Sequence, residues 1–160
     1  MAFSGFSPDL FAFLKGLKAR NEKAWFDAHR EDFDTHVKAP LGDLVTALTA
    51  AFAKDGVPLQ GDAKKSLFRI YRDVRFSKDK SPYKTNAGAV LTASGDKKEP
   101  GMFYMHFEPG ASFVAMGFYM PEPDVLDKLR RSVAEDAKGF QKKLAVLHKK
   151  GLPLAKEYTV

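Results

Sequence analysis

The spacing of apolar residues changes twice along this chain of 160 residues. In residues 10–52 apolar side chains recur every three or four positions, as they do on one face of a helix. From Leu67 they alternate with polar residues, as in a strand with one buried face. After Pro121 the helical spacing returns. Helices, then strands, then helices predict an α+β fold, with N-terminal helices, a central, mainly antiparallel sheet and C-terminal helices.

Three helices are expected before the sheet. The first begins at Ser7-Pro8-Asp9, because serine caps a helix, proline fits its first position and aspartate favours its positive end. We expect Asn21 to cap the second helix, and we expect Pro40 to interrupt it and to begin a third helix that ends at Gly56. The polar residues 56–65 then predict a loop.

About four strands are expected in the sheet. They cover residues 67–76, 87–92, 102–108 and 112–120, and Pro109-Gly110 joins the last two as a hairpin. A further helix opens at Pro123 and is broken or bent at Gly139, and the last helix ends at Gly151.

Length and composition predict a single domain over residues 1–160. The chain has no cysteine, which excludes disulfides and thiolate metal sites and suits a reducing compartment. No stretch reaches the roughly 18–20 apolar residues of a membrane span, so we expect a cytoplasmic protein that does not bind a membrane. The formal charge of +6 favours partners that carry phosphate or carboxylate, although such a charge also serves solubility.

The charge is densest in residues 69–85, after a polar loop and at the start of the predicted sheet. The stretch RIYRDVRFSKDKSPYKT contains six basic and two acidic residues. A loop of lysines, hydroxyls and free amides that follows an arginine-bearing strand can hold an anion. We predict that this strand and loop bind a small ligand with a phosphate or carboxylate group. The predicted ligand-binding residues are Arg69, Arg72, Arg75, Ser77, Lys78, Lys80, Tyr83 and Lys84.

Arg72 interrupts the alternation, because it shares the predicted buried face with Phe68 and Ile70. A buried guanidinium requires a partner. That partner is either a carboxylate such as Glu108 or the anionic ligand itself, unless a bulge turns Arg72 outward. On the opposite face the charges of Arg69, Asp73 and Arg75 are equally consistent with a ladder of ion pairs.

Candidates for acid–base catalysis are weaker. His106 and Glu108 share a strand face with Tyr104, but a polar outer face of an antiparallel strand gives the same pattern. Asp73 and Tyr83 are further candidates within the basic stretch. The chain has neither a glycine-rich nucleotide-binding fingerprint nor a nucleophile elbow, so no cofactor is assigned.

Metal and nucleic-acid binding are the remaining alternatives. His29, Asp32 and His36 have the spacing of one helix face, but His29 also belongs to the apolar stripe, so a packed histidine is favoured and no metal is assigned. A basic sheet with aromatic residues can stack nucleic-acid bases, yet most phenylalanines fall on predicted core faces. A structural or interaction domain with an internal ion-pair network is the other alternative. The sequence assigns no oligomeric state.

Three runs of sequence resemble a known family. They are FLKGLKARNEKAWFDAHREDF (residues 13–33), RIYRDVRFSKDKSPYKT (residues 69–85) and FYMHFEPGASFVAMGFYMPEP (residues 103–123). The chain resembles, over nearly its whole length, the uncharacterised proteins grouped as domain of unknown function 2461, which occur mainly in bacteria and also in fungi. The family has no established activity, so the resemblance implies no catalytic roles. Family members usually continue with a further segment rich in proline, glycine and basic residues, which implies that this chain is truncated or is a short member.

Overall fold

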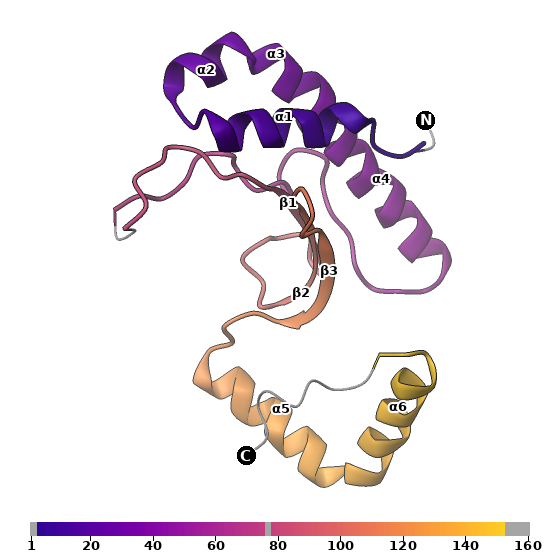
Figure 1. The fold of residues 1–160 in the computed structure, drawn as a ribbon. Coiled ribbons are helices and arrows are strands. Elements are labelled where there is room, and N and C mark those ends of the chain that lie inside the picture. The colour runs from indigo at the N-terminus through magenta and orange to yellow at the C-terminus, as the bar shows by residue number, and fades with distance from the viewer. Residues whose placement is uncertain (1–2, 76–77, 153–160) are drawn as a thin grey trace. The chain divides into compact units, whose positions relative to one another are not determined.

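A computed structural model describes residues 3–75 and 78–152 of the chain (Figure 1). The chain divides into two compact units, Met1–Tyr119 and Met120–Val160. The elements of the first unit are α1 (Pro8–Ala19), α2 (Lys23–Ala28), α3 (Arg30–Asp32), the π-helix η1 (Phe33–Lys38), α4 (Ala39–Lys54), β1 (Ala87–Thr92), β2 (Gly101–Phe107) and β3 (Phe113–Phe118). The second unit contains α5 (Pro123–Glu135) and α6 (Ala137–Lys149). No helix in the described ranges is long and apolar enough to cross a bilayer.

The three strands form one antiparallel sheet in the order β1-β2-β3. Its register pairs Val90 with Tyr104 and Tyr104 with Ala115, so these side chains share one face. Leu91 and Phe103 pair on the opposite face. Helices precede and follow the sheet along the chain, and the predicted α+β fold with a central antiparallel sheet is therefore confirmed.

The helices of the first unit pack on the face of the sheet that carries Leu91 and Phe103. Leu14 of α1 and Leu91 of β1 are both fully buried in one apolar cluster, and the ring of Phe52 from α4 meets Phe103 edge-on at 5.5 Å. Ser7 caps α1 as predicted, since its hydroxyl accepts a hydrogen bond from the Asp9 backbone N–H. The opposite face of the sheet is left for the polar side chains of β2.

The predicted second helix is divided at His29, whose backbone (φ −116°, ψ 22°) leaves the helical region between α2 and α3, and it then widens into η1. The N–H of Ala39 donates to the carbonyl of Asp34, five residues back. Pro40 follows without an N–H to donate, and its ring would clash with the carbonyl four residues earlier in a regular α-helix. The wide turn accommodates the proline, so η1 continues into α4 without the predicted interruption. Pro40 lies in the first turn of α4, as predicted for the start of the third helix.

The prediction of a strand over residues 67–76 is wrong for the part of it that the structure describes. Only isolated bridges form there, between Leu67 and Ala89 and between Tyr71 and Tyr83. Arg72 donates its N–H to the carbonyl of Pro82, but proline has no N–H with which to return the bond. The antiparallel ladder therefore ends at this pair, and the described residues contain three strands where about four were expected.

The second unit is a pair of helices whose boundary lies earlier than predicted. α5 ends at Glu135, and the Asp136 side chain caps α6 by accepting a hydrogen bond from the Gly139 N–H at 2.9 Å. A Cβ at position 139 would lie 1.9 Å from a carboxylate oxygen of Asp136, so glycine leaves room for this cap. Gly151 follows α6 with a positive φ of 76°, as its predicted role at the helix end requires.

Candidate anion-binding site

Residues 67–75 and 78–84 belong to a segment whose two ends β1 and Asn21 hold in place. The Phe68 N–H donates to the Gly88 carbonyl at 2.9 Å, which anchors the start of the segment to β1. Asn21 anchors its end, because its side-chain amide both accepts from the Tyr83 N–H (3.0 Å) and donates to the Tyr83 carbonyl (2.9 Å). Asn21 therefore binds this distant backbone rather than capping α2, whose N-cap is Glu22.

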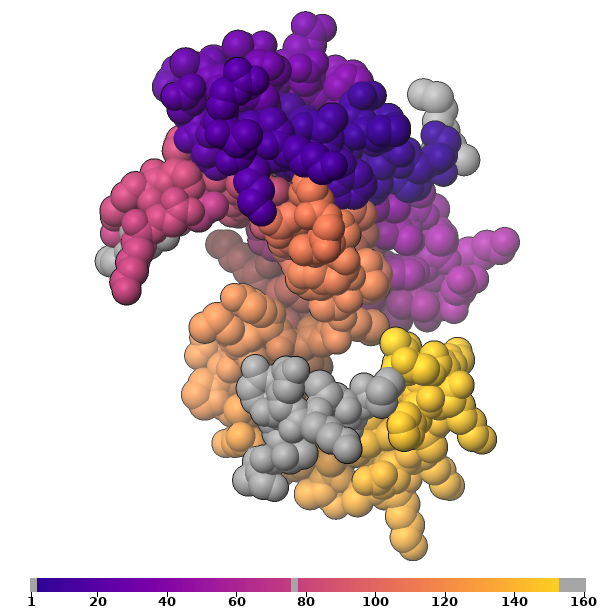
Figure 2. Space-filling view, viewed as in Figure 1, coloured from indigo at the N-terminus to yellow at the C-terminus, as the bar shows by residue number. Residues whose placement is uncertain are grey.

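Arg72 is paired within the segment, to a carboxylate that the sequence analysis did not name. Its guanidinium donates to Asp79, and its side chain is 27% exposed. The predicted alternation of burial holds for residues 70–75, where Arg72 and Val74 are half-buried while Asp73 and Arg75 are exposed. It is wrong at Phe68, which is 37% exposed rather than buried as predicted. The Nε of Arg72 is buried and has no hydrogen-bond partner. The described residues on both sides of positions 76–77, pink in Figure 2, project from the first unit.

Arg75 is also engaged by a carboxylate of the segment. Its Nε and Nη2 donate to the two carboxylate oxygens of Asp73 at 3.0 and 2.7 Å, in a forked pair. These hydrogen bonds lower the pKa of Asp73 to about 2. Asp73 is therefore ionised at neutral pH and occupied by Arg75, which leaves it poorly placed to exchange protons with a ligand.

Three cations gather beside the paired arginines and form what we call the basic cluster: Arg69, Lys84 and Lys97. None of them has a carboxylate at ion-pair distance among the residues that the structure describes. Lys97 reaches the cluster from the loop between β1 and β2, and its Nζ donates to the Leu67 carbonyl at 3.3 Å. Burial, and then the charges of Arg69, Lys97 and Arg72, lower the pKa of Lys84. Positive charge therefore accumulates here without an ion pair among the described residues, and Asp73, which holds Arg75, acts on Arg69 only through its charge.

The basic cluster borders a groove of about 720 Å³, which Arg69 and Lys97 line directly. Lys84 lies next to it, because its Nζ is 5.6 Å from the ring centre of Phe68, a residue of the groove wall. The basic residues that line the groove are Arg30, Lys38, Lys64, Arg69 and Lys97. Asp34 is the acidic residue among those lining it, and it pairs with Lys38 at 3.1 Å. The groove therefore has the sign of charge that attracts anions.

The other predicted ligand-binding residues do not meet at this groove. Lys78 is exposed, and the Nζ of Lys80 donates to the Val74 carbonyl at 2.9 Å. Tyr83 is only 3% exposed and stacks on Phe26 at 4.3 Å. Burial raises the pKa of Tyr83, so this phenol is a core residue that keeps its proton. Ser77 lies outside the described residues.

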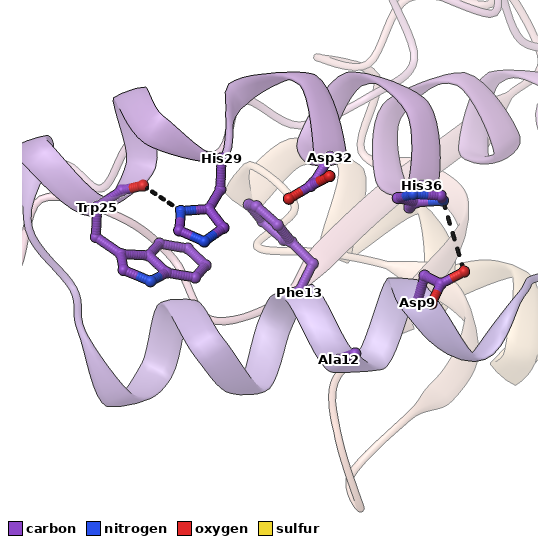
Figure 3. Close-up of a pocket in the computed structure, with 7 residues that line it drawn as sticks. All are labelled: Asp9, Ala12, Phe13, Trp25, His29, Asp32 and His36. Carbon is purple, nitrogen blue, oxygen red and sulfur yellow. Dashed lines mark hydrogen bonds and ion pairs between the residues drawn. The ribbon is translucent and has the colours of Figure 1, made fainter.

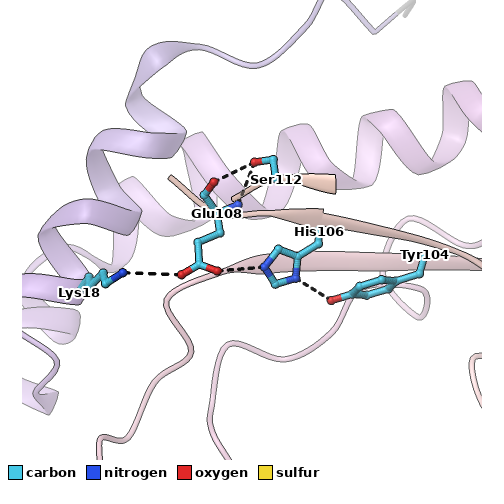
Figure 4. A network of polar contacts seen from close by, with 5 residues as sticks. All are labelled: Lys18, Tyr104, His106, Glu108 and Ser112. Atoms are coloured by element: carbon cyan, nitrogen blue, oxygen red, sulfur yellow. Dashed lines mark hydrogen bonds and ion pairs between the residues drawn. The ribbon is translucent and has the colours of Figure 1, made fainter. Parts of the chain in front are cut away.

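The predicted group on β2 forms a continuous chain of polar contacts (Figure 4). The Tyr104 hydroxyl lies 3.0 Å from His106 Nδ1, and His106 Nε2 lies 3.2 Å from Glu108 Oε2. Lys18 approaches the other carboxylate oxygen of Glu108 at 3.9 Å, and Phe113 stacks on the His106 ring at 4.8 Å. Burial raises the pKa of Tyr104. This series of contacts fixes the orientation of His106. Because its pKa is raised, Tyr104 takes part as a protonated phenol.

His29, Asp32 and His36 do line a common pocket, of about 310 Å³ (Figure 3). The ring of His29 stacks on Trp25 at 4.0 Å, with its Nδ1 2.8 Å from the Trp25 carbonyl. His36 faces Asp9 instead, at 3.8 Å. No group of three or more potential ligands within the described ranges is arranged to hold a metal ion.

The sequence analysis missed Lys97 and Arg30, which reach the groove from segments remote from the basic stretch. Lys97 lies in the loop before β2, where a run of charged residues reads as an ordinary turn. Arg30 lies on α3, where its guanidinium covers the Phe26 ring at 5.1 Å. Neither position has a local signal in the sequence, because only the packing of the helices and β1 around residues 67–71 brings them together.

One family model matches the chain, over residues 9–157, and its description is "Conserved hypothetical protein (DUF2461)". No curated protein and no solved structure matches the chain. The matched range includes every described residue of the basic cluster, the groove and the polar chain on β2. The chain therefore belongs to the DUF2461 family.

Proposed function

We propose that this protein binds a small molecule carrying phosphate or carboxylate at the basic cluster of Arg69, Lys84 and Lys97. The observation that carries the proposal is the contrast within one segment. Arg72 and Arg75 are each paired with an aspartate, whereas the three cations of the cluster repel one another and form no ion pair among the described residues. An anion would remove that repulsion and form hydrogen bonds strengthened by charge.

The groove beside the cluster supports a ligand that is larger than a bare anion. Pockets for small molecules commonly have volumes of about 300–1,000 Å³ and combine apolar walls with a few polar groups. Phe26, Leu41 and Phe68 supply apolar wall here, and Arg69 supplies a fork of donors at its side. The ligand is therefore expected to have an organic part in the groove and its anionic group at the cluster. A cytoplasmic location is part of the same proposal.

A second interpretation, an internal ion-pair network, is supported for two of the arginines, Arg72 and Arg75. The pairs of Arg72 with Asp79 and of Arg75 with Asp73 fold the projecting segment on itself. We assign these arginines to the structure of the segment, and we assign ligand binding to the neighbouring cluster.

A thermal-shift titration tests the proposal. Inorganic phosphate, pyrophosphate and succinate are added at constant ionic strength, and each tenfold increase of a bound anion above its Kd should add about 1.4 kcal/mol of stability. For a chain of this size, each kcal/mol of added stability raises the melting temperature by roughly 2–4 °C. Arg69→Gln is expected to remove most of the shift, whereas Lys78→Gln, the exposed control, should keep it.

Equal shifts in both variants, or no shift with any of these anions, would refute the proposed site. A single-stranded oligonucleotide is titrated in parallel. Binding that falls steeply with salt would favour a nucleic-acid interface instead, because it would report released counter-ions along a polyanion.

A further inference from the structure

The groove beside the basic cluster contains an aromatic ring that is largely open to solvent. Tyr71 lines the groove and is 46% exposed, whereas Phe26, another ring of the groove wall, is 1% exposed. The Tyr71 ring rests against Phe26 and Tyr83, with ring centres 6.2 and 5.4 Å away. Arg30 also forms a hydrogen bond with the Tyr71 side chain. The ring therefore has fixed neighbours and still presents free surface to a ligand.

Tyr71 is well placed relative to the basic cluster, because it follows Arg69 by two residues. The backbone bridge between Tyr71 and Tyr83 shows that the chain is extended here. Arg69 and Tyr71 are both exposed, while Ile70 between them is buried. Alternate residues of an extended chain project to the same side, roughly 6–7 Å apart. Arg69 can therefore hold an anionic group while a ring of the same molecule lies on Tyr71.

Asn86 adds a polar group to the same groove. Its side chain is half-buried, lines the groove and has no hydrogen-bond partner among the residues that the structure describes. Polar groups removed from water are usually hydrogen-bonded, so this free amide is suited to contact a ligand. An amide offers a donor and an acceptor side by side, which matches the paired donor and acceptor groups on the edge of a nucleic-acid base.

We propose that the ligand is a nucleoside phosphate, whose phosphate lies at the basic cluster and whose base stacks on Tyr71 and bonds to Asn86. Each part of such a molecule answers one feature of the groove: the positive charge, the exposed ring and the free amide. The sugar supplies the spacing between phosphate and base. This inference rests on the proposed anion site and adds to it the chemical class of the ligand.

Isothermal titration at constant ionic strength tests the inference with three compounds. Adenosine 5′-monophosphate (AMP) is the whole ligand, ribose 5-phosphate lacks the base, and adenosine lacks the phosphate. AMP is expected to bind roughly 5–150-fold more tightly than ribose 5-phosphate, the factor that stacking of a base on an aromatic side chain contributes.

Two variants locate the base. Tyr71→Leu should remove most of the advantage of AMP and leave the affinity for ribose 5-phosphate unchanged, which also shows that the variant is folded. Asn86→Leu should weaken AMP alone by roughly 2–10-fold, through the loss of a hydrogen bond. Tyr119→Leu is the control, since Tyr119 is 70% exposed and does not line the groove. Unchanged AMP affinity in the Tyr71 or the Asn86 variant would overturn the assigned position of the base.

The three compounds also separate this inference from the proposed function. AMP that binds no more tightly than ribose 5-phosphate would refute the nucleotide and retain the anion site. AMP that binds no more tightly than adenosine would refute the anion site, and the inference with it. Tighter binding of a single-stranded oligoadenylate than of AMP would favour a nucleic acid over a free nucleotide and overturn the inference as well.

Discussion

Replacing Lys97 with glutamate is expected to weaken phosphate binding at the basic cluster by at least about tenfold. A hydrogen bond to a charged group contributes about 1.5–3 kcal/mol, and 1.4 kcal/mol corresponds to a factor of ten in affinity. The substitution removes one such donor and places a negative charge beside Arg69 and Lys84. The new carboxylate could also form ion pairs with Arg69 and Lys84 and so take the place of the ligand's anionic group. Isothermal titration with inorganic phosphate at fixed ionic strength measures the effect.

Lys98→Glu is the matched control, because it changes the net charge equally in the same loop. Lys98 is exposed and does not line the groove, so its replacement should reduce affinity only slightly through the general field. Equal losses in the two variants would mean that net charge, and not the cluster, attracts phosphate.

The second large effect is expected in the core beneath the groove. Phe26→Ala should lower the free energy of unfolding of the first unit by about 3–5 kcal/mol, the usual cost of truncating a buried phenylalanine. Phe26 is 1% exposed, stacks on Tyr83 at 4.3 Å and lies 5.4 Å from Phe33. Urea unfolding followed by tryptophan fluorescence reports on this unit, because Trp25 is the only tryptophan of the chain.

Phe118→Ala provides the comparison, since Phe118 on β3 is 50% exposed. It should cost much less, because little apolar surface leaves water at that position on folding. A loss below about 1 kcal/mol for Phe26→Ala would contradict the aromatic core described here.

The fold class could be predicted because local patterns determine it. A short run of small residues predicted β1 correctly at 87–92, and the alternation of apolar and polar residues gave the right inward and outward sides for residues 72–75. The same alternation could not show whether a partner strand exists, and here Pro82 removes the N–H that would continue the ladder. The pattern of apolar and polar residues indicates which side of an extended segment is buried, whereas the pairing of strands depends on residues distant in the sequence.

The candidate site could be predicted only in part, because the density of charged residues does not reveal which cation pairs with which carboxylate. Arg69 and Lys84 do face the groove region, but Arg72 and Arg75 are satisfied by aspartates seven and two residues away in sequence. Tyr83 carries a hydroxyl that suggested chemistry, yet stacking on Phe26 places it in the core. Lys97 joins the site across thirty residues through its contact with the Leu67 carbonyl, and no local motif encodes that contact.

A titration of Lys84 itself tests the central claim most directly, because the claim concerns cations that form no ion pair among the described residues. Protein labelled with ¹³C at the lysine Cε carbons is titrated by NMR with and without inorganic phosphate, and Lys84→Arg assigns the resonance. The pKa of Lys84 is expected to lie below the ordinary lysine value of 10.5 and to rise when phosphate binds, since a nearby negative charge favours the ammonium form. An ordinary pKa that phosphate does not change would contradict the account.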